Sequence, residues 1–302
     1  MATAQFGRVI TAMITPFTED GAVDYESAVA LAKHLVAHGS EGLLVGGTTG
    51  EGATMTAEEK LKLYTLIVDA VGKRGEGKKV PVMGNIGTIS TADTIAFGNK
   101  AKETGIDCAL VIVPFYVKPN QEGMYQHFTA VAKGVDLPLV LYNVPGRTGV
   151  SIQPETIKRI VDECPNVVGI KDATGSWDQV TKEKALLPED FMIYSGDDAF
   201  TLPVLLAGGV GIISVSAHVI GDDMLAMVDA FEKGDLAKAR ELHLKMYEIN
   251  KGMFFTASPT PVKTATNLVG QPGGHFRLPM VEPTEAEKAK VRQMLENYGG
   301  LL

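Results

Sequence analysis

Short apolar runs alternate with amphipathic segments along most of the chain, and this alternation predicts strands that are each followed by a helix. The apolar runs stop at glycine, proline or polar residues, which is typical of strands buried on both faces in a parallel sheet. We expect strands at residues 8–15, 42–45, 80–83, 108–113, 138–142, 167–171, 191–194 and 211–215.

The segments between these runs carry recognisable helix ends. Asp24 is placed to cap a helix that ends before Gly39, and Thr56 with Glu59 has the spacing of a capping box. Pro154 fits the first position of another helix. Further helices are expected at 91–104, 121–133, 176–187, 199–206 and 224–231. The eight strand–helix units have short connections, which favours a closed (β/α)8 TIM barrel over an open doubly wound sheet.

The pattern changes near Asp235, after which only helical periodicity remains. Leu242, Met246 and Ile249 share one helix face, and residues 284 and 287 form a second capping box. We therefore predict two domains, a catalytic (β/α)8 barrel at 1–234 and a C-terminal helical domain at 235–302. The second domain is expected to pack on the barrel or on a neighbouring subunit.

Composition narrows the class of protein. The 302 residues are 45% hydrophobic with a formal net charge of -8, and they contain no long basic cluster, which argues against nucleic acid or an anionic membrane as a partner. No apolar run is long enough to cross a bilayer, and the first residues lack the features of a signal peptide, so we expect a cytoplasmic protein. Cys108 and Cys164 are expected to be reduced core thiols.

The strand at 167–171 ends in a lysine, which is unusual for a buried strand. In a barrel, Lys171 would lie at the rim where the strand ends. Burial disfavours the ammonium form and lowers the pKa, and the neutral amine that results can attack a ketone to form a Schiff base. The alternative is a lysine that ends the strand and points into water.

Other chemically useful side chains follow the strands toward the same rim, because barrel active sites lie at the carboxyl ends of the strands. Thr48, Tyr116 and Tyr142 offer hydroxyl groups that can relay protons while an imine forms. A buried tyrosine can equally satisfy a core hydrogen bond. Arg147, on a Pro-Gly loop, can hold a substrate carboxylate with two parallel hydrogen bonds, although a solvated loop arginine fits the local sequence as well.

Three segments together resemble the dihydrodipicolinate synthase family of class I pyruvate-dependent aldolases and lyases. They are Gly-Gly-Thr-Thr-Gly-Glu at 46–51, Tyr-Asn-Val-Pro-Gly-Arg-Thr-Gly at 142–149 and Gly-Ile-Lys-Asp-Ala-Thr-Gly at 169–175. The resemblance covers nearly the whole chain. It implies a barrel with a helical C-terminal domain, and a homotetramer assembled as a dimer of dimers.

The resemblance also implies a reaction. Lys171 would form a Schiff base with pyruvate, with no separate cofactor, and the enamine would attack L-aspartate-4-semialdehyde to give 4-hydroxy-tetrahydrodipicolinate in diaminopimelate and lysine biosynthesis. Tyr142 would give and take protons. Thr48 and Tyr116 would complete the relay, with Tyr116 reaching into the neighbouring subunit's site.

Substrate contacts are implied in the same way. Thr49 and Ile213 would contact pyruvate, Gly196 would lie close beside it, and Arg147 would hold the carboxylate of the semialdehyde. Thr48 and Arg147 distinguish the synthases from the similar sialic acid lyases, which usually have a serine-bearing turn and lack the arginine. N-acetylneuraminate lyase or another pyruvate-dependent sugar-acid aldolase is the alternative function.

The chain departs from the family pattern at a few positions. Phe115 replaces the first tyrosine of a Tyr-Tyr pair, and Ala57 and Lys60 stand where lysine-sensitive members often have polar or histidine side chains. These differences argue against feedback inhibition by lysine. Ser258 stands where asparagine is common, with no consequence assigned.

Rival kinds of site have weaker support. His34 and His38 have the i,i+4 spacing of metal ligands on a helix, but no third ligand is near them in sequence, and we predict no metal site. The glycine-rich turn at 46–52 lacks the Lys-Ser/Thr ending of a phosphate-binding loop and contains Glu51, which would repel phosphate. The glycines at 208–211 lie near the last strand, where such barrels bind phosphate, but close approach of the backbone explains them as well. Another alternative is a catalytically silent barrel that binds a keto acid. The hydroxyl groups that can relay protons argue against it, because binding alone needs no proton relay.

Overall fold

Eight parallel strands form a closed barrel in which each strand pairs with the next along the chain. The computed structural model describes residues 3–302. Pairing of β1 with β8, with Ile10 opposite Ile213, closes the barrel, and the predicted TIM barrel is confirmed. The strands are β1 (Val9–Ala12), β2 (Gly42–Val45), β3 (Val82–Asn85), β4 (Cys108–Ile112), β5 (Leu139–Asn143), β6 (Val167–Asp172), β7 (Met192–Ser195) and β8 (Gly211–Ser214).

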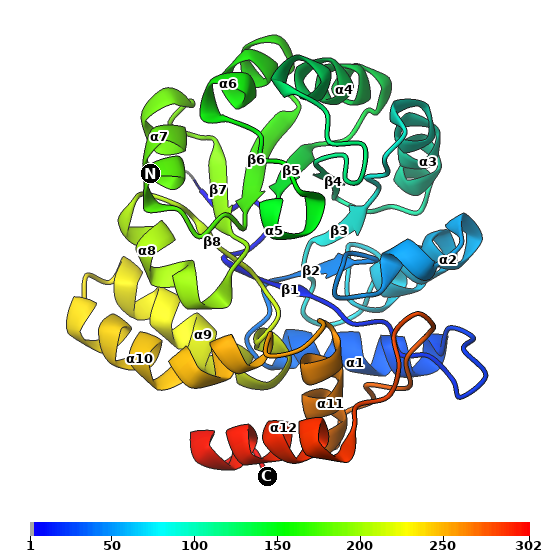
Figure 1. Cartoon of the computed structure of the whole chain (residues 1–302), viewed down its shortest axis with the longest axis vertical. Helices are drawn as coiled ribbons and strands as arrows, with labels where there is room; N and C mark the ends of the chain where they lie inside the picture. Colours follow the sequence, from blue (N-terminus) through cyan, green and yellow to red (C-terminus); the bar gives the residue numbers. More distant parts are fainter. Residues whose placement is uncertain (1–2) are drawn as a thin grey trace.

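Helices surround these strands, as Figure 1 shows. Asp24 caps the first helix and Thr56 with Glu59 forms the predicted capping box of the second. The helices that accompany the barrel are α1 (Tyr25–Ala37), α2 (Ala57–Ala70), α3 (Thr91–Glu103), α4 (Gln121–Gly134), α5 (Pro145–Thr148), α6 (Pro154–Glu163), α7 (Trp177–Leu186), α8 (Thr201–Leu206) and α9 (Ala217–Glu232), with 3-10 turns η1 (Gly52–Thr54) and η2 (Asp198–Phe200).

Three local predictions were wrong. The strand expected at 80–83 runs over Val82–Asn85, because Pro81 has no N–H to donate to a neighbouring strand. The Pro-Gly loop that carries Arg147 is the short helix α5. The helix expected at 224–231 begins earlier, at Ala217. Its backbone is non-helical at Ile220, and this kink interrupts the periodicity on which the prediction depended.

The remaining helices are α10 (Leu236–Gly252), α11 (Thr260–Leu268) and α12 (Glu285–Tyr298). In Figure 1 they lie outside the barrel, on the side of α1 and α9. Both α10 and α11 pack against α9, and α12 packs against α10 and α11. The predicted capping box at Thr284 and Glu287 begins α12. A domain boundary at residue 235 stays a prediction, because α10 continues directly from the barrel helix on which it packs.

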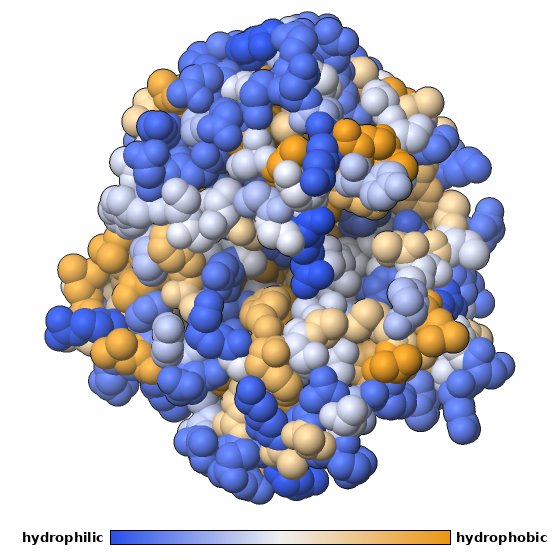
Figure 2. Space-filling model, viewed as in Figure 1, coloured by the Kyte–Doolittle hydropathy of each residue, from blue (hydrophilic) through white to orange (hydrophobic). Residues whose placement is uncertain are grey.

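The apolar side chains form two layers. One layer fills the space between strands and helices, and a second layer, which includes Ile10, Leu110 and Tyr194, fills the barrel interior. Cys108 and Cys164 are free and buried. Hydrophilic residues dominate the outer helices in Figure 2, with smaller apolar patches among them. Within residues 3–302, no helix has the length and apolar character needed to cross a membrane.

Candidate active site

Lys171 and Tyr142 lie side by side at the carboxyl end of the barrel. They are register partners on adjacent strands, β6 and β5. Strand side chains alternate between faces, so Ile170 packs outward in the layer under the helices while Tyr142 belongs to the barrel interior. The ammonium nitrogen of Lys171 lies 4.5 Å from the centroid of the Tyr142 ring. The predicted meeting of these two side chains therefore occurs within the barrel.

Burial changes the acidity of both groups. Lys171 is 4% exposed, and burial lowers its pKa to about 8, with a contribution from Arg147 that Asp198 opposes. At pH 7, Lys171 is then neutral in about a tenth of the molecules. Burial raises the pKa of Tyr142, while Arg147 and a hydrogen bond from Thr48 lower it. The site therefore combines a partly neutral amine with a tyrosine that stays protonated near neutral pH.

The turn after β2 brings Thr48 to this pair. The hydroxyl groups of Thr48 and Tyr142 are hydrogen-bonded. The turn is tight: the N–H of Gly52 donates to the carbonyl of Gly47 at 3.0 Å, and the hydroxyl of Thr15 donates to the carbonyl of Gly50 at 2.7 Å. A Cβ on Gly52 would lie 1.9 Å from the carbonyl oxygen of Gly46. Glycine is therefore required for the turn that carries Thr48.

The structure gives a different environment to each of the three predicted pyruvate contacts. Ile213 is fully buried in the barrel interior on β8, in the same apolar cluster as Tyr142. Thr49 is 5% exposed beside Thr48. A Cβ on Gly196 would lie 3.1 Å from Cγ of Lys171, so a larger residue there would crowd the amine.

Arg147 lies above the barrel end on α5, the short helix in front of the strands in Figure 1. Its side chain is exposed, and its charge reaches both Tyr142 and Lys171. An exposed guanidinium above a buried amine can hold the carboxylate of a substrate that reacts below it.

Tyr116 is not brought to the other candidates within this chain. It is 86% exposed, and its hydroxyl has no hydrogen-bond partner among the described residues 3–302. Its backbone has φ +66, and Lys118 has φ +47, so the loop that carries it is held in an unusual conformation. Phe115 and Val117 beside it are 36% and 57% exposed. The expectation that Tyr116 serves a neighbouring subunit stays a prediction.

A cavity of about 500 Å³ opens beside Tyr142 and Thr48. It is also lined by Lys60 and Phe115, and by Ser258 from the C-terminal part of the chain. The size suits a small organic substrate. Lys60 is half-buried, and burial lowers its pKa. Three residues that depart from the family pattern, Lys60, Phe115 and Ser258, thus line one cavity. The absence of feedback inhibition by lysine stays a prediction.

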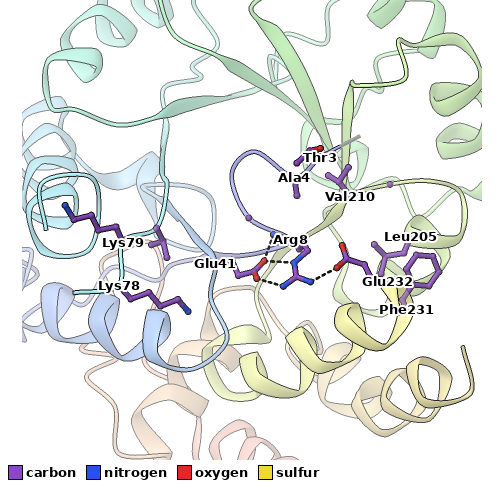
Figure 3. Close-up of a pocket in the computed structure, with 13 residues that line it drawn as sticks. Thr3, Ala4, Arg8, Glu41, Lys78, Lys79, Leu205, Val210, Phe231 and Glu232 are labelled. Atoms are coloured by element: carbon purple, nitrogen blue, oxygen red, sulfur yellow. Dashed lines mark hydrogen bonds and ion pairs between the residues drawn. The ribbon is translucent and has the colours of Figure 1, made fainter. Parts of the chain in front are cut away.

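A second cavity, of about 580 Å³, lies at the opposite, amino end of the barrel. Figure 3 shows Arg8 in it between Glu41 and Glu232. The guanidinium also donates to Asp229 at 2.7 Å. The glycines at 208–211 lead into the amino end of β8, and Gly209 lines this cavity. This position contradicts a phosphate site beside the active site for that segment, because such sites lie at the carboxyl ends of the strands.

The histidine pair at the end of α1 has a structural explanation. The rings of His34 and His38 lie 4.4 Å apart, and Nδ1 of His38 is 3.0 Å from a carboxylate oxygen of Asp222. Among residues 3–302, no three His, Cys, Asp or Glu side chains are grouped so as to hold a metal ion.

Sequence reasoning missed several buried charged residues near the site. Asp198 is 1% exposed and accepts hydrogen bonds from the Ser214 hydroxyl and from the N–H of Val215 at 3.1 Å. Asp172 lies on the outward face of β6, and burial followed by the charge of Asp172 raises the pKa of Glu183 well above its ordinary value. The period-2 alternation of β6 predicts the outward direction of Asp172, but no local signal identifies its partner on α7.

Comparison with known proteins identifies the group to which this geometry belongs. The family model described as the dihydrodipicolinate synthetase family matches residues 5–298. The chain belongs to the dihydrodipicolinate synthetase family. The family resemblance predicted from the three segments is thereby confirmed.

Individual relatives agree with this assignment. The chain is 48% identical to a 4-hydroxy-tetrahydrodipicolinate synthase of Heliobacterium modesticaldum, over 98% of this chain and 96% of that protein. A solved lysine-bound structure from Cyanidioschyzon merolae is 40% identical with a TM-score of 0.94, over 98% of this chain and 99% of that one. A pyruvate complex of the Acinetobacter baumannii dihydrodipicolinate synthase is 35% identical with a TM-score of 0.92, covering 98% and 99% of the two chains. These names favour the synthase over the sugar-acid aldolase.

Proposed function

We propose that the chain is a lyase that condenses pyruvate with L-aspartate-4-semialdehyde through a Schiff base on Lys171 and gives 4-hydroxy-tetrahydrodipicolinate. The observation that carries this proposal is a buried lysine whose pKa is about 8, paired in register with a tyrosine. The names of the relatives support the choice of substrates. No cofactor is required, because the protonated imine formed on Lys171 itself accepts the electron pair that is left when the methyl proton is removed.

The steps follow from the chemistry of an imine. The neutral amine of Lys171 attacks the keto carbon of pyruvate, and the carbinolamine loses water after its hydroxyl receives a proton from Tyr142. Loss of a methyl proton gives the enamine, which attacks the aldehyde carbon of the second substrate. The amino group of that substrate then attacks the imine carbon, closes the ring and releases Lys171.

The remaining residues serve these steps. Thr48 passes protons to and from Tyr142, an assignment supported by their hydrogen bond. Thr49, Gly196 and Ile213 surround the bound pyruvate. Arg147 holds the carboxylate of the semialdehyde, which its exposed place above the amine supports.

The oligomer is part of the proposal. We infer a cytoplasmic homotetramer in which Tyr116 of one subunit completes the relay of the next. The exposed apolar side chains at 115–117 support this assignment, because exposed apolar surface of this kind is typical of a subunit contact. Sedimentation of the wild-type chain and of Tyr116→Asp tests it, since a charge in a buried contact should lower the mass of the complex.

A turnover assay with two aldehydes tests the choice of substrate. The chain is mixed with pyruvate and either L-aspartate-4-semialdehyde or N-acetylmannosamine, and consumption of pyruvate is followed. We expect turnover with the semialdehyde alone. Turnover with the sugar alone would instead favour the sugar-acid aldolase. Arg147→Ala is the matched variant: it should raise KM for the semialdehyde far more than KM for pyruvate, because it removes the carboxylate contact.

A further inference from the structure

A buried ion pair joins the C-terminal helices to the turn that carries Thr48. Glu51, the last residue of the segment 46–51, is 4% exposed. Its Oε1 lies 2.7 Å from the ammonium nitrogen of Lys263 on α11, whose side chain is fully buried. Burial lowers the pKa of Lys263, and the charge of Glu51 opposes that change. Two charges are therefore removed from water at this point of contact, and each depends on the other.

The backbone of Glu51 is bonded to the catalytic turn itself. Its N–H donates to the carbonyl of Thr48 at 3.1 Å. Its φ of +51 lies in the left-handed region, which is uncommon for a residue with a side chain. Such a conformation persists when the surrounding contacts determine it. The ion pair with Lys263 is such a contact, because it holds the side chain of Glu51, the residue whose backbone has this conformation.

Arg277 holds the same turn from a second direction. Its backbone N–H donates to Oε2 of Glu51 at 3.2 Å, so each carboxylate oxygen of Glu51 has its own partner from the C-terminal part of the chain. The guanidinium of Arg277 donates to the carbonyl of Thr54 at 3.1 Å and to both carboxylate oxygens of Glu59. The C-terminal segment thus contacts the turn and the helix that follows it.

These contacts form one connected path into the site. Lys263 contacts Glu51, Glu51 contacts Thr48 and Thr48 contacts Tyr142. We propose that Lys263 is a positioning residue for Schiff-base formation: through Glu51 it fixes the turn that carries Thr48, and so holds the Thr48 hydroxyl against Tyr142. The inference rests on the proposed function, because the relay matters only if Lys171 forms an imine.

A double-mutant cycle separates positioning from general stabilisation. The rate of imine formation with pyruvate is measured by borohydride trapping in four proteins: the wild-type chain, Lys263→Met, Thr48→Val and the double variant. All four are measured at one temperature at which each of them is folded. Lys263→Met should slow trapping by about 10- to 100-fold, the usual cost of misplacing a reacting group. In the Thr48→Val background the same substitution should cost about twofold or less, because the group on which it acts is already gone.

Two results would overturn the inference. They are an equal loss from Lys263→Met in both backgrounds, and a wild-type rate in the single variant. Failure of the proposed function is recognised separately, because the wild-type chain would then form no adduct at all.

Two further variants keep the test decisive. Glu51→Gln breaks the same ion pair and applies if Lys263→Met does not fold; it should show the same dependence on Thr48, and an additive loss would count against the inference. Arg8→Met removes a cation from a carboxylate cluster at the other end of the barrel. Its trapping rate should stay within about twofold of wild type. A loss as large as that of Lys263→Met would mean that any loosening of the barrel slows the reaction.

Discussion

The two ends of the barrel both carry charged side chains, but they use them differently. At the amino end, the 23% exposed side chain of Arg8 binds Glu41, Asp229 and Glu232, and these partners raise its pKa. At the carboxyl end, Lys171 is 4% exposed, and among residues 3–302 no carboxylate forms an ion pair with it. Its pKa therefore falls to about 8.

The comparison teaches which observation marks the reactive end. The amino end has the larger of the two cavities, about 580 Å³ against about 500 Å³, and Arg8 there has three carboxylate partners. Paired charges in partly solvated surroundings are chemically quiet, because both partners keep their ordinary ionised forms. A buried amine without a counterion is neutral part of the time and can react. The state of one lysine, and not the size of a cavity, distinguishes the two ends.

Removal of that amine should have the largest effect. Lys171→Met keeps the volume of the side chain but removes the nucleophile, so turnover should fall by on the order of 10⁶, to background. The fold should be retained, since the substitution removes a buried ionisable group. Product formation and thermal unfolding are measured together. Substantial residual turnover in a folded variant would show that another group is the nucleophile.

Loss of one hydroxyl should have the next largest effect. Tyr142→Phe should slow imine formation by about 10²- to 10⁴-fold, the usual contribution of a positioned general acid-base. Its packing in the barrel interior should be unchanged, because only the hydroxyl is removed. Stopped-flow mixing with pyruvate measures the rate. A wild-type rate would remove Tyr142 from the relay.

The pH dependence of the amine should be visible and movable. Only the neutral form attacks pyruvate, so imine formation at low pyruvate should rise by about tenfold per pH unit below pH 8 and level above it. Asp198 raises the pKa of Lys171. Asp198→Asn should therefore move the levelling point to lower pH. A levelling point that stays in place in the folded variant would contradict the electrostatic role of Asp198.

The smallest expected effect concerns stability at the carboxyl end. Burial raises the pKa of Asp172 and that of Glu183 well above the ordinary value, so the folded state holds a proton that the unfolded chain releases. The bound proton contributes fully to the free energy of unfolding below the ordinary glutamate pKa. The contribution is lost as pH rises through the raised pKa of the folded state, and the free energy of unfolding falls by about 1.4 kcal/mol per pH unit between the two pKa values. In Glu183→Gln this slope should disappear from the free energy of unfolding. Urea unfolding across pH measures it, and parallel curves for the two proteins would mean that Glu183 holds no extra proton in the folded state.

Much of the fold could be predicted from local pattern, because strand and helix periodicity and capping boxes are local signals. The strand at 42–45 agrees with β2, and Asp24, Thr56 and Thr284 cap the expected helices. Where a helix is very short, as at α5, or kinked, as at Ile220, the local pattern is lost.

The site divides in the same way. Lys171, Tyr142 and Thr48 could be placed together because strand ends of a barrel meet at one rim. The partner of Glu51 could not be predicted, because Lys263 lies 212 residues away and no local sequence signal relates the two residues. The raised pKa values of Asp172 and Glu183 likewise depend on three-dimensional burial.

The central claim is that Lys171 is the amine that captures pyruvate, and mass spectrometry tests it most directly. The wild-type chain is reduced with borohydride in the presence of pyruvate, digested, and searched for the added mass on every lysine-containing peptide. The account predicts the adduct on the peptide that contains Lys171 and on no other. An adduct on a different lysine, or no adduct, would contradict it.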